Sequence, residues 1–144
     1  MNLPNGIEIN NLIYSLRNFC WEAADILIYY SQKLRDPDFK RNIIKNTNNN
    51  DPVTLADLQV NKLIIKRISE SYGDISWDIL SEENVKDGSN KSFDNIDWLW
   101  VLDPLDGTKD FIQGTGNYAM HLGLNYKNRA YLGIVLIPQK EELW

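Results

Sequence analysis

The chain has little of several things that mark particular classes of protein. Its single cysteine, Cys20, excludes an internal disulfide framework and a cysteine-based metal site. No apolar run approaches the roughly 18 residues that cross a membrane, so no membrane span is expected. Segment 1–10 has no basic region followed by an apolar stretch. No secretory signal is therefore expected, and a cytoplasmic location is the default.

Positive charge is also scarce, with 15 Lys and Arg against 20 Asp and Glu and a formal net charge of −5. Binding to a nucleic acid polymer through a basic patch is not expected, because phosphate backbones require an excess of Lys and Arg. A small phosphorylated substrate is compatible with this charge, since bound cations reverse the sign of an acidic pocket. The composition, 43% hydrophobic and 24% charged, is typical of one soluble globular domain, 1–144.

An amphipathic helix is predicted near the N-terminus. Apolar residues recur at three- and four-residue spacings within 12–27, which predicts a helix over about 10–33 that ends before Pro37. Cys20 falls on this apolar stripe, where a small buried side chain is expected. The polar segment 42–50 that follows is expected to be a loop.

A second helix is predicted to start at Thr54, a good N-cap residue, and to stop at Gly73. Asp57 occupies the third helical position, which approximates a capping box. The expected buried face consists of apolar residues at helical spacing: Ala56, Val60, Leu63, Ile64 and Ile68.

The rest of the chain has the pattern of short strands, at 77–80, 98–102, 118–126 and 130–137. The continuous apolar run 98–102 predicts a strand that is buried on both faces. Segment 127–129 predicts a hairpin turn, and the polar segment 84–95 a loop. His121 alternates with apolar neighbours, so we expect a half-exposed strand residue rather than a catalytic group.

The last residues, 142–144, have the pattern of another strand that is just beginning, as expected of a fragment or a half-protein. The sheet edge near Trp144 is then expected to be unpaired, which favours self-association into a homo-oligomer. These elements predict an α+β fold with two N-terminal helices packed on a mainly antiparallel sheet.

The densest chemical feature is the sequence Asp-Pro-Leu-Asp-Gly-Thr at 103–108, directly after an apolar strand. Its two carboxylates, Asp103 and Asp106, repel each other at this spacing unless a cation lies between them. The ligands are hard oxygens with no His or Cys nearby, so the natural cation is Mg²⁺. The Leu105 carbonyl, between the two aspartates, is a candidate third ligand.

The residues that follow suit an anion. Gly107 allows close backbone approach, and Thr108 can open a short helix whose N–H groups point at a phosphate. An ordinary strand-to-helix turn is the alternative, because Asp-Pro and Asp-Gly are common turn pieces. The complete run after an apolar strand favours the site.

Two other phosphatase or nucleotide motifs are excluded. Haloacid-dehalogenase-type phosphatases carry an Asp-x-Asp-Gly-Thr loop whose first Asp is the nucleophile. Alignment of 106–108 with that loop puts Pro104 in the nucleophile's place, and proline cannot attack phosphorus. The sequence also lacks a G-x-x-x-x-G-K-[ST] loop.

Three segments together resemble the inositol monophosphatase superfamily of Mg²⁺-dependent, lithium-sensitive phosphatases: 51–57, 80–83 and 103–108. The resemblance covers about 10–144 and implies the N-terminal half of a layered αβαβα sugar-phosphatase-type fold. Members of the superfamily are considerably longer. Their second half supplies another metal-binding aspartate, in a Trp-Asp element, and most of the substrate pocket; this sequence has no match to that element.

The resemblance implies a site for two or three Mg²⁺ ions. Glu82, Asp103 and the Leu105 carbonyl would bind the first ion. Asp103 and Asp106 would bind the second.

The resemblance also implies catalytic roles. Glu82 with Thr108 would orient and activate the attacking water, and the backbone N–H groups of Gly107 and Thr108 would hold the phosphate. Asp57 would help to fix a third metal or its waters, and its role as a helix cap is compatible with this. Successive strand residues point to opposite faces, so only one of Glu82 and Glu83 is expected to face the site, with Glu82 favoured.

Within the superfamily, Ser81 and Lys109 favour the 3′(2′),5′-bisphosphate nucleotidase branch. The inositol branch has Gly-Glu-Glu and Thr-Asn at these places. Lys109 as a solvated surface residue is the alternative. The function implied is hydrolysis of the 3′-phosphate of 3′-phosphoadenosine 5′-phosphate, with inositol monophosphate as the alternative substrate. The hypothesis from a different class is a half-protein that folds and associates without turnover.

Overall fold

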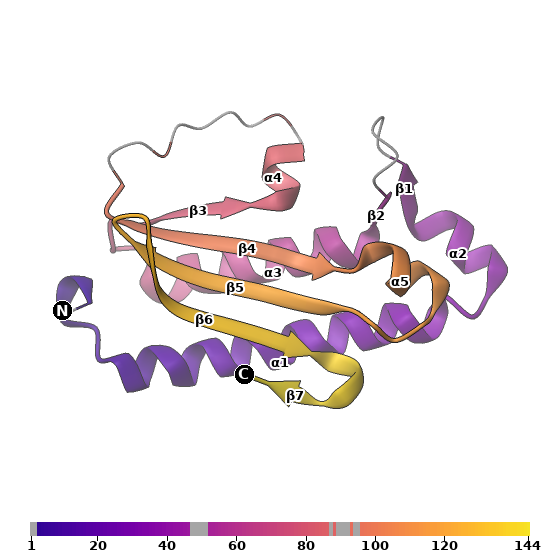
Figure 1. Ribbon diagram of the computed structural model, residues 1–144, viewed down its shortest axis with the longest axis horizontal. Helices are drawn as coiled ribbons and strands as arrows, with labels where there is room; N and C mark the ends of the chain where they lie inside the picture. Colours follow the sequence, from indigo (N-terminus) through magenta and orange to yellow (C-terminus); the bar gives the residue numbers. More distant parts are fainter. Residues whose placement is uncertain (1–2, 47–51, 87, 89–92, 94–95) are drawn as a thin grey trace.

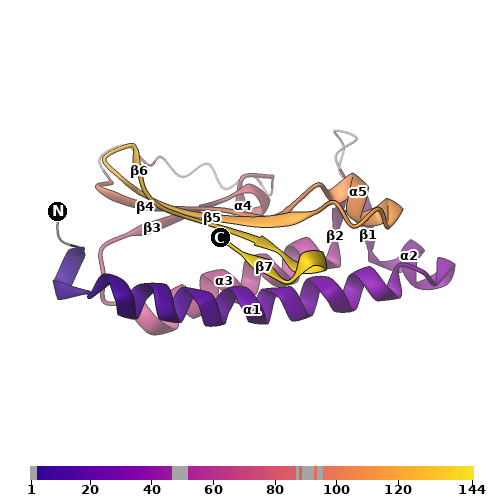
Figure 2. The ribbon, with the colours of Figure 1, turned by 60° about the horizontal axis from the view of Figure 1, so that its bottom comes forward.

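The computed structural model describes residues 3–46, 52–86, 88, 93 and 96–144. Two long helices, α1 and α3, run along one face of a five-stranded sheet (Figure 1). The view from below in Figure 2 shows both helices on the same side of the strands. The other face of the sheet carries no comparable helical layer among the described residues.

The helices and strands have the following bounds: a 3₁₀ turn Pro4–Gly6, α1 Ile9–Lys33, α2 Pro37–Ile43, β1 Ile44–Asn46, β2 Pro52–Thr54, α3 Leu55–Tyr72, β3 Asp78–Ser81, α4 Glu82–Lys86, β4 Trp98–Asp106, α5 Thr108–Gln113, β5 Ala119–Tyr126, β6 Arg129–Ile137, a 3₁₀ turn Pro138–Lys140 and β7 Glu142–Leu143.

The main sheet has the strand order β3-β4-β5-β6-β7. Only the β3–β4 pair is parallel, and the other three pairs are antiparallel. Strands β1 and β2 form a separate antiparallel pair. The predicted α+β fold with a mainly antiparallel sheet is confirmed.

The first helix forms because its apolar stripe packs on the sheet. Its buried residues recur at helical spacing: Leu12, Leu16, Phe19, Cys20, Ala23, Ala24, Leu27 and Tyr30. Cys20 is fully buried as expected, and burial raises the pKa of its thiol to about 12, which leaves it unreactive. Arg67 of α3 donates a 2.6 Å hydrogen bond to Glu22, which ties the two helices together.

The second predicted helix is also confirmed, with its expected cap. The Thr54 side chain accepts from the backbone N–H groups of Ala56 and Asp57, and the Asp57 carboxylate accepts from the Thr54 N–H. This reciprocal capping box satisfies N–H groups that have no helical partner. Gly73 follows the helix directly.

The expectation that 98–102 is buried on both faces is wrong. Trp98, Trp100 and Leu102 are buried, whereas Val101 is 37% exposed. The side chains of a strand alternate between faces, and α1 and α3 cover only one of them. Trp100 contacts Trp77 edge-on with ring centroids 5.4 Å apart, so the aromatic residues serve the core on the covered face.

Two predicted loops contain regular structure. Segment 42–50 was expected to be a loop, but α2 reaches Ile43 and β1 continues to Asn46; residues 47–50 lie outside the described part. Pro37 begins α2 behind an N-cap at Asp36, so this proline starts a helix as well as following one. Segment 84–95 was also expected to be a loop, but its first residues belong to α4, and most of the rest is not described.

The C-terminal hairpin and final strand agree with prediction. Lys127 and Asn128 have φ values of 47° and 61°, the left-handed pair that a tight hairpin turn requires. Strand β7 pairs with the end of β6 and forms one edge of the sheet. In the described ranges, no helix is both long and apolar enough to cross a bilayer.

The packing of α1 gives a stability prediction. Leu16→Ala removes a fully buried side chain, and we expect the free energy of unfolding to fall by about 2–5 kcal/mol. Tyr14→Ala on the same helix alters a side chain that is 69% exposed, and the change should stay within about 0.5 kcal/mol. Denaturant unfolding measures both. Equal losses would contradict the assigned helix face.

Candidate metal and phosphate site

The candidate site lies where β4 ends and α5 begins. Gly107 links the two elements with a φ of 80°, which glycine tolerates far better than other residues. A Cβ atom at this position would lie 2.7 Å from the Asn117 backbone oxygen, so the turn also needs glycine for space. The chain can therefore reverse sharply and present Asp106 and Thr108 on either side of one residue.

Parallel pairing brings a second segment to the same place. Ser81, the last residue of β3, pairs with Leu102 of β4. The next residues along the chain, Glu82 at the start of α4 and Asp103 within β4, therefore lie side by side. They share a hollow of about 310 Å³, which is lined by Glu82, Asp103, Leu105, Asp106, Gly107, Thr108, Lys109 and Asp110.

The hollow thus brings together the residues predicted to bind metal and phosphate. Glu82 lines the hollow, whereas Glu83 does not. The strand argument for that separation is wrong, because both glutamates begin α4 rather than ending β3. The outcome is nevertheless the one expected. The Glu82 side chain is 42% exposed, and that of Glu83 is only 4% exposed.

Asp57 lies outside the lining of the hollow and reaches it through Thr108. The Thr108 hydroxyl lies 3.3 Å from Asp57 Oδ1 and 3.0 Å from the Leu105 carbonyl oxygen, the two acceptors of its hydrogen bond. Asp57 is 1% exposed, and burial raises the pKa of its carboxyl. It is the helix cap and also accepts a hydrogen bond from Thr108, while its role toward a third metal stays a prediction.

The carboxylates in the hollow repel one another. Burial, and then the negative charge of Glu82, raise the pKa of Asp103 to about 7. The Leu105 N–H donates a 3.1 Å hydrogen bond to Asp103 and partly opposes this rise. A cation bound beside Asp103 would stabilise the ionised form of its carboxyl.

The donor set fits Mg²⁺, although the described residues include no group of three or more His, Cys, Asp or Glu side chains spaced for a metal ion. Glu82, Asp103, Asp106 and the Leu105 carbonyl are all hard oxygen donors at one hollow. Mg²⁺ commonly takes one or two carboxylates and completes its shell with water and substrate phosphate. These four groups are the ones that would hold it.

A buried polar chain supports the segment that carries Glu82. The Ser81 hydroxyl donates to Asn61 of α3, and the Asn61 amide donates a 3.1 Å hydrogen bond to Asn84 of α4. Ser81 is fully buried. Sequence reasoning missed Asn61, although it lies one helical turn beyond Asp57 on the otherwise apolar buried face of α3.

His121 is half-buried, as expected for a strand residue. The antiparallel register of β4 and β5 sets it opposite Asp103, on the same face of the sheet. The histidine is therefore the cross-strand neighbour of Asp103, although it is not among the residues that line the hollow.

Comparison with known proteins agrees with this geometry. Residues 11–144 match the model of the inositol monophosphatase family. The Nus factor SuhB of Haemophilus influenzae is 35% identical over 107 residues, which cover 73% of this chain and 38% of the relative. The 3′(2′),5′-bisphosphate nucleotidase CysQ of the same organism is 29% identical over 117 residues, covering 78% of this chain and 41% of the relative.

A solved structure shows the same fold. The IMPase of Thermotoga maritima superposes with a TM-score of 0.71 at 22% identity, over 94% of this chain and 47% of the other. The chain thus spans less than half the length of these relatives.

The raised carboxyl pKa values give a pH prediction. A pKa raised above the unfolded value of about 4 means that the folded protein holds its proton more tightly, so stability falls as pH rises from about 4 toward 7. Without metal, we expect the melting temperature to fall between about pH 4 and pH 7. Asp103→Asn should flatten that fall.

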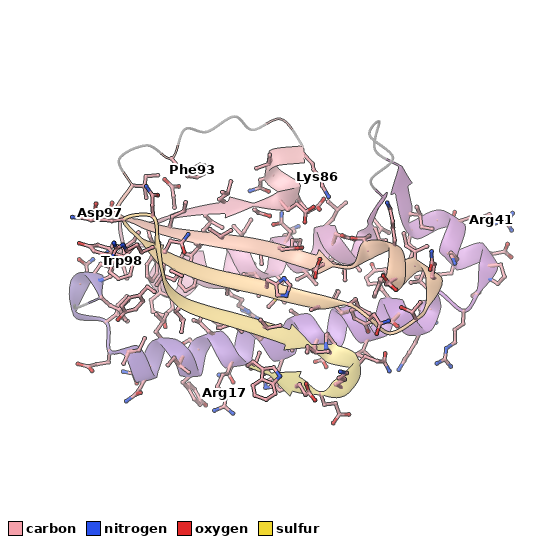
Figure 3. The ribbon with its side chains drawn as sticks, in the orientation of Figure 1. Arg17, Arg41, Lys86, Phe93, Asp97 and Trp98 are labelled. Carbon is pink, nitrogen blue, oxygen red and sulfur yellow. The ribbon has the colours of Figure 1, made fainter. Side chains whose placement is uncertain are left out.

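Asp97→Asn is the matched control. Asp97 precedes β4 at the end far from α5 (Figure 3), and its side chain is 62% exposed. This variant should keep the wild-type slope. Identical slopes in all three proteins would contradict the crowding of carboxylates at Asp103.

Proposed function

The chain belongs to the inositol monophosphatase family, and we propose that its site binds Mg²⁺ and hydrolyses a phosphomonoester. One observation carries the proposal. Glu82, Asp103 and Asp106 meet in one hollow, where burial and mutual repulsion raise the pKa of Asp103 to about 7. Such a cluster is stabilised by a divalent cation, and the Gly107–Thr108 turn beside it leaves room for a phosphate.

The chain's own groups then act on water and phosphate. Mg²⁺, when bound, neutralises charge on the phosphate and lowers the pKa of a bound water. The Glu82 carboxylate and the Thr108 hydroxyl orient the attacking water, and Glu82 takes up its proton. The N–H groups of Gly107 and Thr108 hold the phosphate oxygens. The water oxygen bonds to phosphorus as the ester P–O bond breaks, which gives phosphate and an alcohol without a covalent enzyme intermediate.

The hydrogen-bond acceptors around Thr108 support this role. Asp57 Oδ1 and the Leu105 carbonyl oxygen both lie within hydrogen-bonding distance of it. With its proton directed toward these acceptors, the hydroxyl oxygen is left to accept a hydrogen bond from water.

For the substrate we propose 3′-phosphoadenosine 5′-phosphate, with inositol monophosphate as the alternative. Lys109 supports the first, because it lines the hollow and adds a positive charge where a doubly phosphorylated substrate would enter. Relatives named for different activities match the chain at similar identity, so the choice rests on Lys109 and on Ser81 beside Glu82.

Phosphate release by this chain tests the function. We expect turnover of 3′-phosphoadenosine 5′-phosphate that requires Mg²⁺, is blocked by Li⁺ and exceeds that of inositol 1-phosphate. Asp103→Asn should lower the rate by about 100-fold or more, because it removes a proposed ligand of both metals. Asp97→Asn should retain the wild-type rate, because it changes an exposed charge at the far end of β4.

Faster turnover of inositol 1-phosphate than of 3′-phosphoadenosine 5′-phosphate would favour the inositol branch. A folded chain that binds Mg²⁺ without turnover would instead establish the second hypothesis, a half-protein with metal affinity. A folded chain that neither binds Mg²⁺ nor releases phosphate would refute the proposed function of this chain.

We further propose that β7 mediates self-association. This two-residue strand forms the sheet edge, and Trp144 beyond it is 76% exposed. Beside it lies a hollow of about 590 Å³, lined mainly by the apolar residues Ile13, Trp21, Leu132, Ile134, Leu143 and Trp144. An exposed strand edge beside apolar surface favours pairing with a second copy. Sedimentation velocity should detect a dimer that Trp144→Lys weakens, and a monomer at all concentrations would exclude it.

A further inference from the structure

Helix α4 carries a lysine that lies against the proposed metal site. The Lys86 ammonium is 2.8 Å from Glu82 Oε1 and 3.3 Å from Glu83 Oε1. Figure 3 shows Lys86 at the end of α4. The spacings i,i+4 and i,i+3 make Lys86 a neighbour of each glutamate on the helix surface.

This contact differs from an ordinary surface ion pair. The Lys86 side chain is 24% exposed, compared with 77% for Arg41 in its pair with Asp38. Glu83, which also contacts Lys86, is 4% exposed, and burial raises the pKa of that carboxyl while Lys86 opposes the rise. Partial burial weakens solvent screening, so these charges interact more strongly than exposed ones.

Glu82 therefore contacts both the Lys86 ammonium and the acidic hollow. Its carboxylate contacts Lys86 on one side and the Asp103 carboxyl on the other. The lysine contributes a positive charge where three carboxylates converge. A divalent cation that binds Glu82 must compete with it.

We propose that Lys86 is a tethered counter-ion of the acidic hollow: its ammonium holds Glu82 in the metal-free protein, and a divalent cation must displace it. The inference rests on the proposed metal site. Glu83 makes the displacement feasible, because it is a second acceptor within reach and the ammonium can transfer fully to it. Lys86 thus stabilises the metal-free fold and lowers affinity for the metal.

Mn²⁺ binding followed by electron paramagnetic resonance tests the proposal, with Mg²⁺ as competitor. Lys86→Met should bind Mn²⁺ roughly fivefold more tightly than wild type, as expected from loss of one partly buried charge contact. The same variant should melt at a lower temperature without metal. Lys86→Arg keeps the charge and should restore affinity to within about twofold of wild type.

Lys109→Met is the matched control. It removes the same charge from the lining of the same hollow, and Lys109 has no ion pair with a carboxylate among the described residues. Its affinity should change less than that of Lys86→Met, because a solvated charge without a direct contact is screened. If Lys86→Met does not fold, Lys86→Gln is interpreted in the same way.

The outcomes separate this inference from the proposed function. Unchanged or weaker Mn²⁺ binding in Lys86→Met, with a lowered melting temperature, would make Lys86 purely structural and overturn the inference alone. An equal gain in Mn²⁺ affinity in Lys109→Met would also overturn the inference. The loss of any positive charge near the hollow would then explain the gain, without a direct contact to Glu82. Mn²⁺ binding that is absent from wild type, or that survives in Asp103→Asn, would reject the proposed site and the inference together.

Discussion

The parallel pairing of β3 with β4 is the constraint on which the site depends. The other described pairs of the main sheet are antiparallel, so this is the one described pair whose two neighbouring strands run toward the same edge. Glu82 directly follows Ser81 of β3, and Asp103 directly follows Leu102, the β4 partner of Ser81. The free energy that holds these carboxylates close comes from the strands and the core behind them, including the fully buried Trp100.

Buried polar groups make this arrangement specific. Asp57 links the start of α3 to Thr108, and the chain from Ser81 through Asn61 to Asn84 links the middle of α3 to α4. Each of these groups loses water on burial and recovers hydrogen bonds only in this geometry. Helix α3 is thus the common support for both segments that meet at the hollow.

The two long helices and the acidic site could be predicted from local sequence. Helical spacing in 12–27 and the cap at Thr54 determine α1 and α3, and the 103–108 sequence indicated the acidic site. Long-range effects account for the failures. Val101 is exposed because no described helix covers its face, which no local pattern encodes. Lys86 was missed because its segment was expected to be a loop, where the i,i+4 spacing to Glu82 has no meaning.

The same alternation that exposes Val101 also explains why the site is accessible. Trp98, Trp100 and Leu102 point toward the helices, so Asp103, one residue further, points to the opposite face. The hydrophobic core and the acidic hollow therefore lie on opposite sides of one strand. Carboxylate repulsion is kept out of the core, where ionised groups would be most costly, and Asp103 stays accessible without any change in the packing beneath it.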